Sequence, residues 1–243
     1  MNTPLSSTAI VLAAGFGTRM RPLTLSTPKP LLRVAGKTML DHAIDKLVAT
    51  GISRIVVNTF YLAEQIEEHL KKRTDVSIVI SREEEPLETG GGVLRALPYF
   101  DNRPFFALNA DLPWVDEGEP SLDLMRRAWT PDVMDTLLLV VRTKNARGFD
   151  PAGNFSMDDN GRLHRKDVPP PRPFSMMAAQ ILKPSLFDNP PSTVFSNRVV
   201  WDRAEEHGLF FGVEHQGTCY HIGRPEDLDH ANALLASGKG WRV

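Results

Sequence analysis

The chain has 243 residues, enough for one large α/β domain that buries its own core. Its 28 Lys and Arg nearly balance 30 Asp and Glu, and the formal net charge of −2 argues against general attraction to nucleic acid or to a membrane surface. The single cysteine, Cys219, excludes an internal disulfide and a multi-cysteine zinc site. The balanced charge favours small molecules as ligands. We also expect a cytoplasmic protein, because no apolar run reaches the roughly 20 residues of a membrane span and no basic residue precedes Ala9.

The N-terminal half alternates predicted strands with predicted helices. Ala9–Ala14 is apolar throughout, as expected of a strand that is covered on both faces. Apolar residues recur at helical spacing over Met39–Val48, and Gly51 ends that helix. The alternation continues through strand Ile55–Asn58, helix Leu62–Lys72, strand Ser77–Ser81, helix Gly91–Leu97 and strand Phe105–Asn109. This order predicts an α/β fold with a doubly wound, mostly parallel sheet.

The pattern is less regular after Asp111. The predicted elements are helix Leu122–Trp129, strand Thr136–Arg142, a hairpin of Phe155–Met157 and Leu163–Arg165, strand Met176–Leu182, helix Val200–Glu206, strand Leu209–Val213 and helix Pro225–Leu235. The proline-rich segment Val168–Pro173 predicts an extended, exposed connection. No repeat and no strong shift in composition divides the chain. We therefore predict a single domain over residues 1–243 with a mixed, mostly parallel sheet.

Glycines follow the first predicted strand, in the segment Leu12–Met20. Backbone N–H groups exposed at such a point can cradle phosphate oxygens. The dinucleotide fingerprint is excluded because Met20 stands where it needs Gly or Ala, and a P-loop is excluded because no Gly-Lys-Ser/Thr follows. Gly-x-Gly alone would also suit a tight turn. The cations Arg19 and Lys29, in a segment stiffened by prolines, favour a polyphosphate site.

These segments resemble the sugar-1-phosphate nucleotidyltransferases. The segments that carry the resemblance are Leu12–Thr24 with Pro28–Leu31, the second glycine loop Leu87–Gly92, and Asn109–Asp111 at the position of the family's metal motif. The resemblance covers most of residues 8–115 and, more loosely, Phe174–Ala236, and its spacing is most similar to the N-acetylmuramate-1-phosphate uridylyltransferases. It implies a Rossmann-like nucleotidyltransferase fold without a C-terminal β-helix. It also implies a nucleotide-binding half at about 8–115 and a sugar-phosphate-binding half at about 116–243.

The resemblance implies a Mg²⁺-dependent transfer of UMP from UTP to a sugar 1-phosphate. The implied acceptor is N-acetylmuramate 1-phosphate, and the products are a UDP-sugar and pyrophosphate, formed in peptidoglycan recycling. A phosphate monoester is mostly dianionic at pH 7, so no base needs to activate it. Cations must instead align two anions and stabilise the leaving group. Arg19 is assigned to the β- and γ-phosphates, Lys29 to the α-phosphate and Asp111 to Mg²⁺, with Mn²⁺ as an alternative.

Further residues are assigned by the same resemblance. The nucleotide contacts are Leu12, Ala13, Ala14, Gly15, Phe16, Gly17, Thr18, Arg19, Lys29, Glu85, Thr89, Gly90, Gly91 and Asn109, and the sugar-phosphate contacts are Asn154, Gln180 and His221. Glycines in the second loop would let the base approach closely, and Thr89 is expected to cap the helix that follows. Glu83 and Glu84 are expected to be solvated. Arg142, Arg162, Arg165 and Lys166 are available cations that we expect to be exposed to solvent.

Two departures from the family pattern leave alternatives open. His221 stands where many relatives have a second metal-binding Asp, and imidazole is a poor Mg²⁺ ligand. Either Mg²⁺ relies on Asp111, phosphate and water, or His221 contacts phosphate, or Mn²⁺ is preferred, or activity has been lost. Met177 and Ala178 replace a Thr-Gly pair that faces the sugar, so the acceptor stays open. The alternatives are a guanylyltransferase for heptose or mannose 1-phosphate and a non-catalytic regulatory protein that binds nucleotide sugars.

Overall fold

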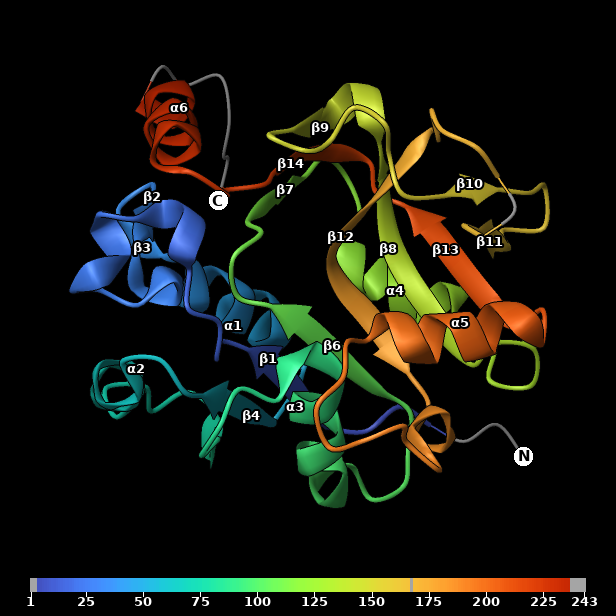
Figure 1. Ribbon diagram of the computed structural model, residues 1–243, viewed down its shortest axis with the longest axis horizontal. Helices are drawn as coiled ribbons and strands as arrows, with labels where there is room; N and C mark the ends of the chain where they lie inside the picture. The colour runs from blue at the N-terminus through green and yellow to red at the C-terminus, as the bar shows by residue number, and fades with distance from the viewer. Residues whose placement is uncertain (1–3, 167, 237–243) are drawn as a thin grey trace.

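A seven-stranded sheet forms the centre of the computed structural model, which describes residues 4–166 and 168–236 (Figure 1). The strand order is β13-β8-β12-β6-β1-β4-β5. The bounds are β1 Thr8–Leu12, β4 Arg54–Thr59, β5 Ser77–Arg82, β6 Phe105–Asn109, β8 Thr136–Arg142, β12 Phe174–Leu182 and β13 Phe210–Glu214. Within this sheet, β12 is antiparallel to both of its neighbours and the other pairings are parallel. The predicted mixed, mostly parallel sheet is confirmed.

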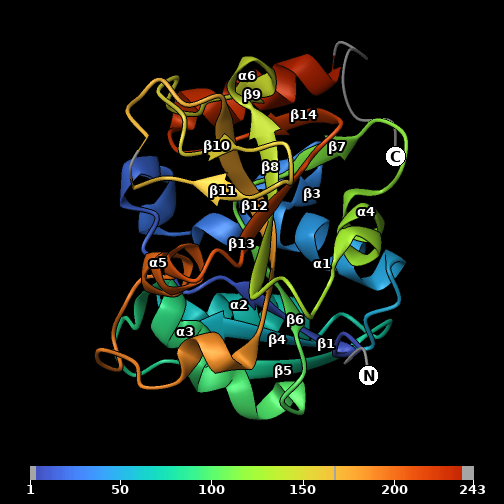
Figure 2. The same cartoon turned by 90° about the vertical axis from the view of Figure 1, so that its right-hand side faces the viewer.

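Helices cover both faces of this sheet. One face packs against α1 (Met39–Ala49), α2 (Ala63–Leu70) and α4 (Ser121–Ala128), and the other against α3 (Glu88–Ala96) and α5 (Arg198–Glu206). Successive strand residues point to opposite faces, so Val11 belongs to the first core and Ile10 to the second. Figure 2 shows the strands between α3 and α5 on one side and α1 and α4 on the other. This double coverage explains why the strands are apolar without alternation.

Several predicted boundaries differ from the structure. The first strand ends at Leu12, two residues earlier than predicted, because Ala13 already hydrogen-bonds to a side chain of β4. Helix α3 begins at Glu88, three residues before its predicted start. Strand β12 carries a bulge between Met176 and Gln180. The predicted hairpin is confirmed as β10 (Ser156–Met157) and β11 (Leu163–His164), and residues 168–173 form neither helix nor strand, as predicted.

The sequence pattern predicted the terminal helix but missed two small sheets. The small sheets pair β2 (Arg33–Val34) with β3 (Lys37–Thr38), and β7 (Trp114–Asp116) with β14 (Gly217–Tyr220) and β9 (Ala146–Arg147). Two- to four-residue strands are too short to show a period. Helix α6 (Pro225–Ala236), which was predicted, packs with Met20 and Tyr220 in a third core. The 3₁₀ turns are Thr18–Met20, Leu23–Leu25, Lys29–Leu31, Leu97–Phe100, Thr143–Asn145 and Pro184–Phe187.

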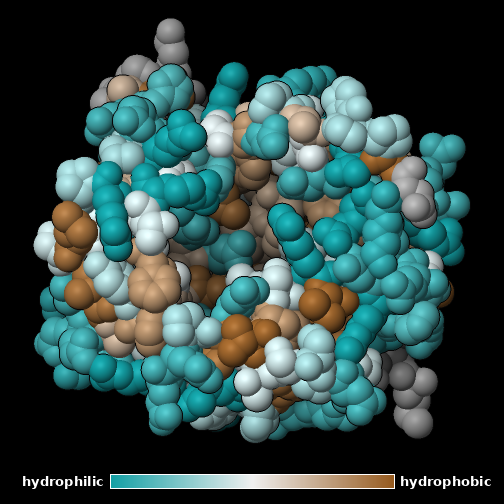
Figure 3. Space-filling model, in the orientation of Figure 1, coloured by the Kyte–Doolittle hydropathy of each residue, from teal (hydrophilic) through white to brown (hydrophobic). Residues whose placement is uncertain are grey.

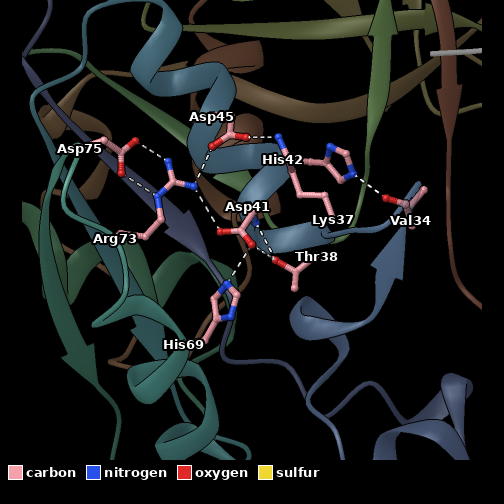
Figure 4. Close-up of polar contacts among 9 residues, drawn as sticks. All are labelled: Val34, Lys37, Thr38, Asp41, His42, Asp45, His69, Arg73 and Asp75. Atoms are coloured by element: carbon pink, nitrogen blue, oxygen red, sulfur yellow. Dashed lines mark hydrogen bonds and ion pairs between the residues drawn. The ribbon is translucent and has the colours of Figure 1, made fainter. Parts of the chain in front are cut away.

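A polar network holds α1 against α2 (Figure 4). Arg73, which follows α2, donates to Asp41 (3.2 Å) and Asp45 (2.7 Å) of α1. His69 of α2 lies 2.9 Å from the same Asp41 carboxyl. Thr38 Oγ1 caps α1 by accepting the N–H of Asp41 (3.0 Å). The network fixes the helix that packs behind β1. None of the helices in the described ranges is long and apolar enough to cross a membrane.

Candidate active site

Two neighbouring pockets lie at the carboxyl ends of the central strands, and a hollow is visible near the centre of the face in Figure 3. The first pocket is a cavity of about 540 Å³ between the first glycine loop and the start of α3. The second pocket, about 510 Å³, lies beside β12 and the start of α5. Thr89 and Asn109 line both pockets. Ligands in the two pockets would therefore be direct neighbours.

The glycine loop after β1 contains backbone N–H groups that are not hydrogen-bonded to the described part of the protein. Gly17 has φ +61°, and a Cβ there would lie 3.0 Å from the Cβ of Lys29, so both conformation and space require glycine. Ala13 donates its N–H to Asn58 Oδ1 (2.7 Å), which anchors the start of the loop. Within the described residues, the N–H groups of Gly15 and Phe16 have no protein acceptor. These free donors are what phosphate oxygens require.

Lys29 and Asp111 form an ion pair in the wall of the first pocket. Lys29, in the 3₁₀ turn Lys29–Leu31, is 7% exposed, and its Nζ lies 2.6 Å from Asp111 Oδ2, just beyond β6. Burial acts to raise the pKa of the Asp111 carboxyl, but the Lys29 ammonium outweighs it and holds that pKa below its usual value. Residues 82 positions apart in the chain therefore place a cation and an anion at one point of the pocket.

Arg19 and His221 flank Gly223 from two sides. A Cβ at Gly223 would lie 3.4 Å from Arg19 Nη1 and 3.3 Å from His221 Cε1. Arg19 is exposed and forms no ion pair within the described residues. Burial lowers the pKa of His221, whose Nδ1 lies 3.1 Å from the Gly148 oxygen. His221 is thus held close to the Lys29–Asp111 pair as a neutral imidazole, and it lines the second pocket.

The second glycine loop corrects several expectations. Glu83 is not solvated: it is 4% exposed, accepts from Asn58 Nδ2 (2.7 Å), and burial raises its pKa. Thr89 does not cap α3 but accepts the N–H of Asn197 (2.9 Å). Gly90 and Gly91 donate their N–H groups to the Phe195 oxygen instead of facing the first pocket. Glu84 is exposed, as predicted, and Glu85 is exposed without lining either pocket.

The glycines of this loop are required by protein packing. A Cβ at Gly91 would lie 2.2 Å from the Thr193 oxygen, and one at Gly92 would lie 2.6 Å from Asn58 Nδ2. The loop therefore docks against the segment that precedes α5 on one side and against β4 on the other. Thr89 belongs to this loop and lines both pockets, so the docked loop forms part of the wall of each.

Gly91→Ala should destabilise the protein by about 1–3 kcal/mol, because the new methyl group displaces the Thr193 backbone. Thermal denaturation followed by circular dichroism measures this change. Gly15→Ala is the matched control, since a Cβ there meets nothing within 4 Å. Equal melting temperatures for both variants would show that the 193–195 segment yields at little cost.

The structure brings most of the predicted site residues together. The predicted nucleotide contacts that line the first pocket are Leu12, Ala13, Ala14, Gly15, Phe16, Gly17, Thr18, Arg19, Lys29, Thr89 and Asn109. The three predicted sugar-phosphate contacts, Asn154, Gln180 and His221, all line the second pocket. Asn58 and Glu83 were missed, although each lies where a predicted strand ends. Arg172 and Arg198 were also missed, and nothing in their sequence context distinguishes them from surface arginines.

The additional cations that the sequence offered are largely neutralised. Arg142 pairs with Glu214 (2.8 Å), Arg165 with Asp202 (2.5 Å) and Lys166 with Glu206 (2.7 Å). Arg162 lies over the Phe211 ring and donates to the Gly208 oxygen (3.1 Å). Of this group, Arg165 alone is among the residues that line the second pocket. The predicted exposure holds for Arg142 and Lys166, whereas Arg162 and Arg165 are partly buried.

A divalent cation fits this donor set if the substrate supplies most of its ligands. Asp111 offers a carboxylate in the pocket wall, and no group of three acidic, His or Cys residues gathers for a metal within the described residues. Mg²⁺ commonly binds through one or two carboxylates together with substrate phosphates and water. Asp111 would hold the ion, which would neutralise charge on the phosphate oxygens when bound. The neutral imidazole of His221 is not a preferred Mg²⁺ ligand.

Fold and site together are those of an α/β nucleotide-binding transferase with two adjoining pockets. The chain belongs to the nucleotidyl transferase family, whose model matches residues 8–165. Within that family it is a sugar-1-phosphate nucleotidyltransferase. The Rossmann-like fold is confirmed, and no β-helix occurs in the described part of the chain.

Individual relatives agree with this membership. The chain is 38% identical over 233 residues, 94% of its length and 96% of the relative, to the N-acetylmuramate alpha-1-phosphate uridylyltransferase of Caulobacter vibrioides. It is 42% identical over 109 residues, 43% of its length and 30% of the relative, to the mannose-1-phosphate guanylyltransferase catalytic subunit beta of Drosophila melanogaster. A UDP-glucose pyrophosphorylase complexed with UDP-glucose superposes with a TM-score of 0.78 at 17% identity, covering 95% of this chain and 98% of that one.

Proposed function

We propose that the protein transfers UMP from UTP to N-acetylmuramate 1-phosphate, giving UDP-N-acetylmuramate and pyrophosphate with Mg²⁺ as the metal. The nucleotide half, about 8–115, would supply the first pocket and the half at about 116–243 would supply most of the second. The observation that carries this proposal is the pair of adjoining pockets with Lys29 and Asp111 beside their boundary. The substrate choice follows the relative that matches nearly the whole chain. The cytoplasmic location and the role in peptidoglycan recycling stay predictions.

The proposed chemistry needs few groups from the protein. An oxygen of the sugar phosphate forms a bond to the α-phosphorus of UTP, and the bond to the bridging oxygen of the leaving pyrophosphate breaks. Because the attacking phosphate is already mostly dianionic, the protein must align the anions and not remove a proton. Loop N–H groups and Arg19 would hold the β- and γ-phosphates. Lys29 would stabilise charge at the α-phosphate, with Mg²⁺ held at Asp111.

A substrate panel tests this proposal. We expect pyrophosphate release and a UDP-sugar product with UTP, Mg²⁺ and N-acetylmuramate 1-phosphate, at kcat/KM at least about tenfold above that with GTP, because hydrogen-bonding groups placed for uracil would be left unpaired by guanine. The assay runs the four nucleotides against N-acetylmuramate, mannose, heptose and glucose 1-phosphates. Release of pyrophosphate with GTP alone would contradict the uridylyl choice. Nucleotide binding without any turnover would favour the regulatory alternative.

A guanylyltransferase is the second candidate. The observation in its favour is the 42% identity over 109 residues to a mannose-1-phosphate guanylyltransferase subunit. That match covers 43% of the chain, whereas the uridylyltransferase match covers 94%. The second pocket, which the acceptor would occupy, is built mostly from the C-terminal half. The uridylyltransferase match, which combines 94% coverage with 38% identity, is therefore the better guide to the acceptor.

A further inference from the structure

Two arginines of the second pocket carry charges that no carboxylate neutralises within the described residues. Arg165, the pocket's third arginine, donates twice to Asp202 (2.9 and 2.5 Å). Arg172 instead donates to the backbone oxygens of Val168 and Arg165 (2.7 Å each). Arg198 is exposed, and its side chain has no hydrogen-bond or ion-pair partner in the part of the chain that the structure describes. The pocket therefore holds unbalanced positive charge.

The start of α5 adds to this positive charge. Arg198 is the first residue of the nine-residue helix α5, and Ser196, Asn197 and Arg198 line the pocket in succession. The N-terminal end of a helix carries a partial positive charge that favours anions. Figure 1 shows this end of α5 directed toward the middle of the molecule, near β12. Asp150 is the acidic residue among those lining the pocket, and its Oδ1 accepts the N–H of Ala152 (2.9 Å).

Unpaired buried amides in the same pocket point to a polar ligand. Gln180 is 1% exposed, and the Trp201 indole N–H donates to its Oε1 (2.9 Å), which fixes the direction of the amide. Among residues 4–166 and 168–236, the remaining Nε2 has no hydrogen-bond partner, and neither has Oδ1 of Asn197, which is 3% exposed. Buried polar groups in native structures are almost always paired. An acceptor sugar that enters the pocket would supply the missing hydrogen-bond partners.

We infer that Arg198, supported by Arg172 and the start of α5, binds a carboxylate of the acceptor sugar in the second pocket. The inference rests on the proposed function. N-acetylmuramate is N-acetylglucosamine with a lactyl ether, so the two sugar 1-phosphates differ by one carboxylate-bearing group. Arg198 would select the acidic sugar by a charged hydrogen bond that the neutral sugar cannot form. Arg198 is thus a specificity-determining residue and takes no part in the transfer at the α-phosphate.

Acceptor selectivity in wild type and Arg198→Gln tests the inference. Wild type should prefer N-acetylmuramate 1-phosphate over N-acetylglucosamine 1-phosphate by about 10- to 100-fold in kcat/KM, the value of a charged hydrogen bond. In Arg198→Gln this ratio should fall to within about threefold of one, mainly through a higher KM for the acidic acceptor, and Arg198→Lys should restore part of it. Arg142→Gln is the matched control, because Arg142 is exposed, is paired with Glu214 and does not line the second pocket, and this variant should retain the wild-type ratio.

The outcomes separate this inference from the proposed function. Arg198→Gln with the wild-type preference would overturn the inference while the uridylyl transfer stands. A wild-type enzyme that turns over both acceptors equally would overturn it as well. No turnover of N-acetylmuramate 1-phosphate by wild type, with turnover of another sugar 1-phosphate, would instead refute the proposed acceptor. Circular dichroism and the KM for UTP check that each variant is folded and keeps its first pocket intact.

Discussion

Lys29→Met should lower kcat of the transfer by about 10²- to 10³-fold with little change in the KM for the acceptor. The reason is that the ammonium stabilises charge that develops at the α-phosphate, and a methionine of similar length supplies no charge. Lys29 is 7% exposed and fixed 2.6 Å from Asp111, so no solvent cation can readily take its place. Steady-state pyrophosphate release at saturating substrates measures the effect.

Lys72→Met serves as the control for Lys29. Lys72 is exposed beyond α2 and lines neither pocket, so its replacement should leave kcat within about twofold. The melting temperature of Lys29→Met must also be measured, because Asp111 loses its partner in that variant. If a folded Lys29→Met enzyme retains wild-type kcat, the assignment of this cation to the reacting phosphate is wrong.

Asp111→Asn should reduce metal-dependent turnover by at least about 10²-fold. Asparagine keeps the shape of the side chain and an oxygen ligand, but it lacks the charge that a hard divalent cation prefers. Lys29 holds the pKa of Asp111 below its usual value, which favours the ionised carboxylate as the ligand in wild type. Turnover measured over a range of Mg²⁺ concentrations should show a weaker apparent metal affinity. Parallel assays with Mn²⁺ test whether a softer ion rescues the variant.

Asp101→Asn is the matched control for this variant. Asp101 is exposed and has φ +53°, a conformation that asparagine adopts readily. Its rate and its metal dependence should equal those of wild type. Full Mg²⁺-dependent activity in Asp111→Asn would place the metal elsewhere, and His221 would then be the next residue to replace.

Several residues that line the first pocket could be predicted from the sequence, because their chemical type or local backbone distinguishes them. Gly17 and Lys29 stand in a segment of distinctive order, and Asp111 directly follows an apolar strand. Sequence reasoning failed where a residue's role depends on what packs against it. Glu83 reads as part of an acidic run, yet it is buried because Asn58 and the Leu87 N–H pair with its carboxyl. Gly91 reads as a ligand-facing glycine, yet its space is taken by Thr193.

The secondary-structure elements likewise divide into those that local sequence predicts and those that depend on pairing with distant parts of the chain. Long strands such as β8 were predicted from an unbroken apolar run and amphipathic helices such as α1 from their helical period, because both signals lie within one short stretch of consecutive residues. The short strands β7, β9 and β14 pair across about seventy residues or more and have no period of their own. They nonetheless bring His221 and Gly223 to Arg19 and so complete the first pocket.

The sequence by itself determined the αβ order, and it singled out the glycine loop, the two cations and the acid that line the first pocket, since each of these signals depends on neighbours along the chain. Only the tertiary structure decided which of the many surface charges stay unpaired. Nothing in the local sequence distinguishes Arg165 from Arg198. In the structure, Asp202 pairs with Arg165, whereas no carboxylate among the described residues pairs with Arg198. Whether a charge is available to a ligand depends on which groups folding brings within a few ångströms of it, and sequence distance does not contain that information.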